Sequence, residues 1–362
     1  MNATSTILSL QPPARSRFKR GLMLAAALGF SLDLALADPA ASNPKPQDLT
    51  GLSLEELLHE QITPINVLGS HTHLKNQIMV GYRYMFTQMG DNLEGTREVS
   101  QAEVLARYPV VHTGMTMQMH MAELMYAPSD FATVMAMIPY EDMSMDHLFR
   151  NGSTRTDHAS GLGDVSFMGM FNVLGDPHHL GQRLVLNAGF TAPTGSIDQS
   201  LNGSHLEYAM QLGSGTFDLL PGLTYLGESD QWAWGAQVLG TVRLDYNDNH
   251  YRLGNEYRLS AWAQFKLTDW FGPSARFDWH AWGHVQGADP TLDPNRNPAF
   301  DATKLWGERL DFLAGINFYI PNGPLRGNRF SLEGGVPVYQ NIGGPNLGVN
   351  WLITVALNYT FH

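Results

Sequence analysis

The sequence predicts an all-β fold: an antiparallel transmembrane β-barrel of about 12 strands, with a short N-terminal periplasmic helical segment. Three observations support this fold class. Apolar residues recur at every second position in segments of about ten residues, long and short connections alternate between these segments, and aromatic residues stand near the segment ends. Together these patterns are typical of a barrel whose outer face meets lipid.

The N-terminal region predicts export from the cytoplasm. A basic stretch ending at Arg20 is followed by the apolar stretch 21–32 and by Ala35-Leu36-Ala37, which together indicate a signal peptide over residues 1–37. Residues 38–76 are expected to form a periplasmic linker. A short helix is expected to begin at Ser53 of this linker, because Glu56 follows at the capping-box spacing.

The barrel is expected over residues 77–362. Its first strand begins at Gln77 and puts Ile78, Val80 and Tyr82 on one face, and its last strand ends at Phe361. Between them lie ten further alternating segments: 115–127, 131–140, 161–173, 183–191, 215–226, 232–245, 257–267, 271–285, 308–320 and 329–339.

The predicted connections alternate in length. Those at 90–114, 141–160 and 192–214 are long, whereas those at 128–130 and 268–270 are short. Outer-membrane barrels have short periplasmic turns and longer external loops, and an even strand number returns both termini to the periplasm. The pattern therefore predicts an outer-membrane protein of the Gram-negative type.

Composition excludes several other classes. The chain of 362 residues has a net charge of −12 and no cysteine, so disulfides, thiolate metal sites and cysteine nucleophiles are excluded. We expect no nucleic-acid partner because no basic stripe is present. After the N-terminal region, no apolar run reaches the ~20 residues that a membrane-spanning helix needs.

Placing the apolar face outward makes one wall of the lumen rich in methionine. Twelve of the 17 methionines fall between Met79 and Met145. The predicted solute path on this wall comprises Met79, Arg83, Met85, Met117, Met119, Met121, Glu123, Met135, Met137, Asp164, Met168 and Met170. The opposite wall is predicted to be charged, with Arg258, Arg276, Asp278 and His280.

Three interpretations of the methionines stay open. Methionine is flexible and polarisable, so it can fill irregular gaps in a packed interior or form an adaptable surface along which hydrophobic solutes pass. Thioethers also suit Cu(I) and other soft metals. The segment with Met143, Met145 and His147 is the candidate metal site for this third interpretation.

No catalytic motif supports an enzyme. The sequence contains no nucleophile elbow, P-loop or zinc-protease motif. The segment Asp157-His158-Ala159-Ser160-Gly161 is the nearest approach to the motif of outer-membrane phospholipases, but it lacks their asparagine. We therefore predict a protein with no enzymatic activity and no cofactor.

Several short motifs carry a family resemblance. They are Val80-Gly81-Tyr82-Arg83-Tyr84-Met85, Leu124-Met125-Tyr126-Ala127-Pro128-Ser129-Asp130, Met135-Ala136-Met137-Ile138-Pro139-Tyr140, Ser160-Gly161-Leu162-Gly163-Asp164-Val165, Pro193-Thr194-Gly195-Ser196, Gln211-Leu212-Gly213-Ser214-Gly215-Thr216 and Asp218-Leu219-Leu220-Pro221-Gly222. With these motifs the chain resembles the transporter-like outer-membrane family named for the meta-pathway of phenol degradation. The resemblance implies a barrel that passes hydrophobic or aromatic compounds, and it supplies no catalytic residues.

The predicted function is a passive channel or transporter for small hydrophobic or aromatic solutes, with binding of copper or another soft metal as the alternative. The expected partners are outer-membrane lipid, a small-molecule solute and the barrel-assembly machinery, because the chain ends on an aromatic, alternating strand.

Overall fold

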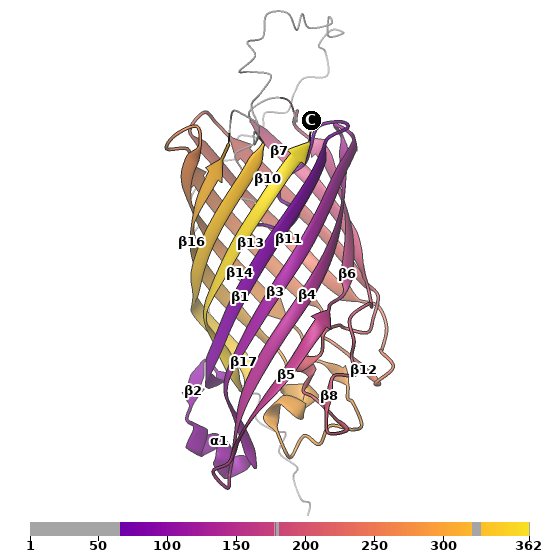
Figure 1. Cartoon of the computed structure of the whole chain (residues 1–362), viewed down its shortest axis with the longest axis vertical. Coiled ribbons are helices and arrows are strands. Elements are labelled where there is room, and N and C mark those ends of the chain that lie inside the picture. The colour runs from indigo at the N-terminus through magenta and orange to yellow at the C-terminus, as the bar shows by residue number, and fades with distance from the viewer. Residues whose placement is uncertain (1–65, 177, 179–180, 321–326, 362) are drawn as a thin grey trace, which may run out of the picture. The chain divides into compact units, whose positions relative to one another are not determined.

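The computed structural model describes residues 66–176, 178, 181–320 and 327–361. The predicted signal peptide and the helix expected at Ser53 lie outside these residues. The described residues form a closed antiparallel β-barrel (Figure 1). No helix among them has the length and hydropathy of a membrane-spanning helix.

Eleven strands form the barrel wall, and each pairs with the next along the chain. They are β1 (Ile78–Gly95), β3 (Val110–Ser129), β4 (Ala132–Phe149), β6 (Val165–Leu174), β7 (Gln182–Ala192), β10 (Asp218–Glu228), β11 (Trp232–Arg243), β13 (Glu256–Phe265), β14 (Phe271–Trp282), β16 (Gly307–Tyr319) and β17 (Asn328–Phe361).

The long segment β17 passes through the wall twice. Its first part pairs antiparallel with β16, from Arg329 to Ile342, and its second part pairs antiparallel with β1, from Ile342 to Phe361. Gln340 and Val349 also join the two parts, since the Val349 N–H donates to Gln340 Oε1 over 2.9 Å. The two passes of β17 and the ten other strands give twelve antiparallel passes, which confirms the predicted barrel.

Two of the expected loops contain regular structure. β1 continues to Gly95 and is followed by β2 (Arg97–Val99) and by α1 (Gln101–Arg107). Ser100 and Glu103 form a capping box at the start of α1, because each satisfies a backbone N–H that the first helical turn leaves free. The sequence predicts a loop over 90–114, and the capping-box spacing of Ser100 and Glu103 is the local signal for this short helix.

The second such loop, 141–160, is an extended hairpin. β4 runs to Phe149 and returns as β5 (Thr154–Leu162), which pairs with β4 and lies outside the closed ring. The chain reverses only at Gly152, whose φ of 84° suits glycine. The remaining short elements lie in the external connections: β8 (Ser200–Leu201), β9 (Ser204–His205), η3 (Tyr208–Met210), β12 (Tyr251–Arg252), β15 (Gln286–Gly287), η4 (Pro298–Phe300) and η5 (Ala302–Lys304).

The apolar face of the strands points outward, as the alternation predicts. On β3, Leu124 is 52% exposed while Met121 and Met125 are buried. Leu186 of β7 is 44% exposed next to the buried Val185. A continuous ring of exposed apolar side chains would be costly in water but is stable against lipid tails. The methionine face is therefore the inner face of the barrel.

A charge on the outer face should destabilise the barrel according to its depth. We expect Leu186→Arg, in the middle of β7, to lower the free energy of unfolding by about 2–4 kcal/mol in lipid vesicles. Leu174→Arg, at the end of β6, should cost about 1 kcal/mol or less because an interfacial side chain reaches water. Urea titration monitored by tryptophan fluorescence compares the two variants. Equal losses would contradict the assignment of the lipid-facing surface.

Candidate functional site

The chain segment that precedes β1 lies inside the barrel. The sequence predicts a periplasmic linker up to residue 76, but residues 66–73 of that linker occupy the lumen. Three lumen-facing side chains hold this plug segment. Gln237 of β11 donates to the Leu68 carbonyl over 2.9 Å, Asn187 of β7 donates to the Gly69 carbonyl over 3.1 Å, and Asn66 donates to Ser331 Oγ of β17 over 2.7 Å. The plug segment thus crosses the lumen between opposite strands.

Gly69 marks the tightest point of the plug segment. Its φ is +64°, and a Cβ at this position would lie 2.9 Å from Met168 Sδ and 3.2 Å from Asn187 Nδ2. A larger residue would meet both backbone strain and a steric clash. Only glycine fits the plug segment at this position without a rearrangement.

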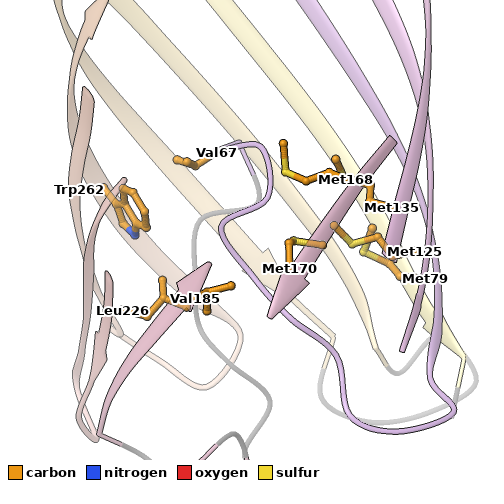
Figure 2. Close-up of a cluster of buried hydrophobic side chains, with 9 residues drawn as sticks. All are labelled: Val67, Met79, Met125, Met135, Met168, Met170, Val185, Leu226 and Trp262. Carbon is orange, nitrogen blue, oxygen red and sulfur yellow. The ribbon is translucent and has the colours of Figure 1, made fainter. Parts of the chain in front are cut away.

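Methionines pack around the plug segment. Val67 lies between one group of side chains on the methionine wall and a second group from β7, β10 and β13 (Figure 2). The first group consists of Met79, Met125, Met135, Met168 and Met170, and the second of Val185, Leu226 and Trp262. Of the predicted path residues, Met79, Met135 and Met170 therefore serve to seat the plug segment.

A cavity of about 710 Å³ fills the lumen on the external side of the plug segment. Asn66, Val67 and Leu68 form part of its lining, and residues of the external connections, including Tyr208 and Trp306, form another part. Its methionine wall consists of Met85, Met89, Met115, Met117, Met119, Met121, Met137, Met145 and Met168. Its charged wall includes Arg258, Arg276, Asp278, His280, Arg309 and Asp311.

Most of the predicted path residues meet in this cavity. Arg83 also lines it, whereas Glu123 does not; the two form a buried ion pair with nitrogen and oxygen 3.0 Å apart. Unpaired charges inside a barrel would be costly, and the pairing explains why both residues can share the methionine face.

The charged wall is a network of paired groups. Arg276 donates to both carboxylate oxygens of Glu333, over 3.1 and 2.5 Å, and Arg309 donates to Asp311 over 2.9 Å. His280 Nε2 lies 3.0 Å from a carboxylate oxygen of Glu256. Because the charges largely compensate one another, this wall offers polar contacts without a strong field of one sign.

Asp164 lies neither in the cavity nor in the cluster around the plug segment. Its Oδ1 accepts from the Gly195 N–H over 2.9 Å, and its Oδ2 accepts from the N–H and the hydroxyl of Ser214, each over 2.8 Å. A Cβ on Gly213 would lie 2.6 Å from the Gly195 carbonyl oxygen, so the two backbones pack in direct contact. The Gly-Leu-Gly-Asp, Pro-Thr-Gly and Leu-Gly-Ser-Gly motifs thus meet at one point and anchor an external connection.

The candidate metal residues are divided between two environments. Met143 and Met145 are buried in an apolar cluster with Met115 and Met210. His147, by contrast, points its Nε2 at Glu207 over 2.8 Å.

His112 completes this second environment. Neither His112 nor Glu207 is among the site residues that the sequence predicts. His112 lies opposite His147 on the neighbouring strand, and its Nε2 is 3.1 Å from the same oxygen of Glu207. Burial alone raises the pKa of Glu207, but the hydrogen bonds and charges of the two histidines outweigh burial and lower that pKa well below its usual range. No short-range motif joins residues 112, 147 and 207, so only the fold reveals the cluster.

Similar folds occur among outer-membrane barrels of known structure. The COG4313 outer membrane channel from Pseudomonas putida F1 has a TM-score of 0.58 at 14% identity, and the match covers 83% of this chain and 100% of that one. The Ralstonia pickettii toluene transporter TbuX has a TM-score of 0.40 at 10% identity, over 80% of this chain and 90% of that one. A Pseudomonas aeruginosa FadL homologue has a TM-score of 0.37 at 9% identity, over 79% and 90%. The first likeness shows the fold.

Family membership rests on the sequence. No curated protein sequence matches the chain. The model of the family described by the MetA-pathway of phenol degradation matches residues 112–333, which include β4 to β16 and the three anchoring motifs. Together with the closed barrel and its lipid-facing surface, this match confirms both the predicted resemblance and the outer-membrane location. The chain belongs to the MetA-pathway of phenol degradation family of outer-membrane β-barrels.

Proposed function

We propose that the barrel is a passive channel for small hydrophobic or aromatic solutes, in which the methionine wall is the contact surface and the plug segment is the barrier. The observation that carries this proposal is the lumenal cavity of about 710 Å³ with nine methionines on one wall. An apolar protein cavity of ~150 Å³ already accommodates benzene. The lumen therefore has room for a substituted monoaromatic compound.

The two walls suit an amphipathic aromatic solute. Thioethers make favourable contacts with aromatic rings and adapt to different shapes. The paired groups of the charged wall offer hydrogen bonds to a hydroxyl without demanding an ionic solute. A phenolic compound satisfies both walls, and the family to which the chain belongs is named for phenol degradation. The proposed role is transport without catalysis.

A fluorescence titration with a brominated phenol tests this proposal. Trp282 and Trp306 line the cavity, so binding of the heavy-atom probe should quench tryptophan emission to saturation. Replacing Met117 and Met119 together by aspartate should weaken binding roughly tenfold, because hydrated carboxylates replace the apolar surface against which the aromatic ring packs, at a cost of at least about 1.4 kcal/mol.

The matched control replaces the same two methionines by leucine, which preserves an apolar wall and should keep binding within about threefold. Uptake of radiolabelled toluene by cells that express each variant links binding to passage. Quenching that never saturates, or equal affinity in the aspartate and leucine variants, would refute the methionine wall as a solute surface.

The soft-metal alternative retains one supporting observation. Met115, Met143 and Met145 lie in one buried cluster near the external end, where a Cu(I) ion would meet several thioethers. Loss of Cu(I) binding after all three are changed to leucine would support this alternative, whereas the channel proposal predicts no dependence of solute passage on copper.

The proposal also includes how the chain reaches the outer membrane. We infer that residues 1–37 are removed as a signal peptide and that the barrel-assembly machinery recognises the final strand, which ends with Tyr359 and Phe361. Replacing both aromatic residues by alanine should reduce the amount of folded barrel in the outer membrane, as judged by heat-modifiable migration.

A further inference from the structure

The cluster of His112, His147 and Glu207 lies where two strands meet an external connection. His112 on β3 and His147 on β4 are cross-strand partners. Glu207 precedes η3 in the connection between β7 and β10. All three side chains are at most 2% exposed, and one ligand atom of each lies within 4.8 Å of those of the other two.

The hydrogen-bond donors of the cluster do not match its acceptors. Asn297 is fixed, because its Oδ1 accepts from the Ala299 N–H at the start of η4. Its Nδ2 lies 2.9 Å from Glu207 Oε1 and 2.9 Å from His112 Nε2. Either tautomer of His112 leaves one contact unfavourable. With a proton on Nε2, this nitrogen and Asn297 Nδ2 are two donors 2.9 Å apart; without it, the lone pairs of Nε2 and Glu207 Oε1 face each other over 3.1 Å.

Glu207 is also left with an unused ligand atom. Its Oε2 is buried and has no hydrogen-bond partner among the described residues. A buried carboxylate oxygen without a donor is costly. A cation among the three side chains would satisfy this oxygen and would also remove the conflict at His112, since a metal accepts lone pairs from both groups.

We propose that His112, His147 and Glu207 bind one divalent transition-metal ion at the external end of the barrel, with Zn²⁺ as the reference ion. Two imidazoles and a carboxylate are a ligand set that zinc accepts, with a fourth position left for water. This donor set differs from the thioethers of the soft-metal alternative, because nitrogen and carboxylate ligands favour divalent ions over Cu(I).

A second carboxylate supports the orientation of His147. Asp157 Oδ2 lies 3.8 Å from His147 Nδ1 and is itself held by Arg155 over 2.6 Å. At this distance the carboxylate makes an electrostatic contact with the ring and not a hydrogen bond, and its negative charge favours a proton on Nδ1, as in histidine metal sites with a carboxylate beside the ring nitrogen that does not bind the metal. The arrangement leaves His147 Nε2 as the ligating atom.

The site would fasten an external connection to the wall. Glu207 is the only one of the three ligands outside a wall strand, and the next residues, Tyr208 and Ala209, line the cavity. A bound ion therefore holds the cover of the cavity to β3 and β4. This inference does not depend on which solute the lumen accepts.

The test is equilibrium dialysis of the refolded full-length barrel, stripped with chelator, against Zn²⁺. We expect one Zn²⁺ per chain by mass spectrometry, an upward shift of the thermal transition with zinc, and loss of both effects in Glu207→Gln. His205→Gln is the matched control, because His205 lies on the same connection and pairs with Asp289 over 2.7 Å; this variant should keep one zinc.

Cobalt gives a readout that does not depend on any variant. Co²⁺ bound to the wild-type barrel should show the visible absorption of a four- or five-coordinate site, and Zn²⁺ should displace it. Heat-modifiable migration establishes that each variant is folded. No zinc above background in the wild type, or one zinc retained in folded Glu207→Gln, would overturn the proposal.

Discussion

Removing the side chains that hold the plug segment should open the barrel. Asn187 and Gln237 donate to the carbonyls of Gly69 and Leu68, and each such hydrogen bond contributes about 1 kcal/mol. The double variant Asn187→Ala/Gln237→Ala should therefore shift the ratio of seated to released plug segment about thirtyfold. Single-channel recordings in planar bilayers should show longer and more frequent openings than in the wild type.

A matched control and a deletion complete this test. Gln264 faces the lumen from β13 but shares no hydrogen bond with the plug segment among the described residues, so Gln264→Ala should leave the openings unchanged. Deleting residues 66–73 should give a permanently conducting barrel. A deletion variant that folds yet stays closed would show that the external connections, and not the plug segment, block passage.

Breaking the Arg276–Glu333 pair should destabilise the barrel strongly. Both residues are buried and joined by two hydrogen bonds. Glu333→Leu should lower the free energy of unfolding by about 3 kcal/mol, near the lower end of the range for a buried pair that loses one partner, because Asp278 still lies 3.7 Å from Arg276. Urea titration in lipid vesicles measures the loss.

Two further variants separate pairing from general disruption. Replacing both partners, as Arg276→Met/Glu333→Leu, should restore most of the lost stability, since the Arg276 charge is removed and Asp278 keeps Arg258, 3.8 Å away, and the Ser260 hydroxyl as partners. Asp269→Asn removes a largely exposed partner of Lys266 and should cost less than about 1 kcal/mol. If the double variant is no more stable than Glu333→Leu alone, the network argument fails.

The barrel could be predicted from the sequence because its signal is local. Successive side chains along a strand point to opposite sides of the wall. The faces of Met121 and Leu124 can therefore be predicted without knowledge of their distant partners. The last hairpin was predicted as two strands for the same reason. The ends of the strands were less predictable, because β4 continues beyond the membrane into an extension where both faces are polar or buried by connections.

The site was predictable only in part, because its decisive contacts are long-range. The methionine wall follows from strand alternation, and most of its members do line the cavity. The plug segment cannot be predicted in this way, since no local pattern near Val67 indicates that Gln237 and Ser331 bind the neighbouring residues. One signal was present: Val67-Leu68-Gly69 is apolar and glycine-bounded within a stretch otherwise interpreted as a linker.

The way the plug segment is held has a consequence for the order of folding. Its holders Asn187, Gln237 and Ser331 lie 118, 169 and 265 residues from their partners along the chain. Contacts across such separations form late, because a long loop must close before they contribute. Residues 66–73 leave the ribosome before any strand of the barrel, but the contact of Asn66 with Ser331 can form only once the last hairpin has joined the wall. A fully seated plug segment is therefore a mark of completed assembly.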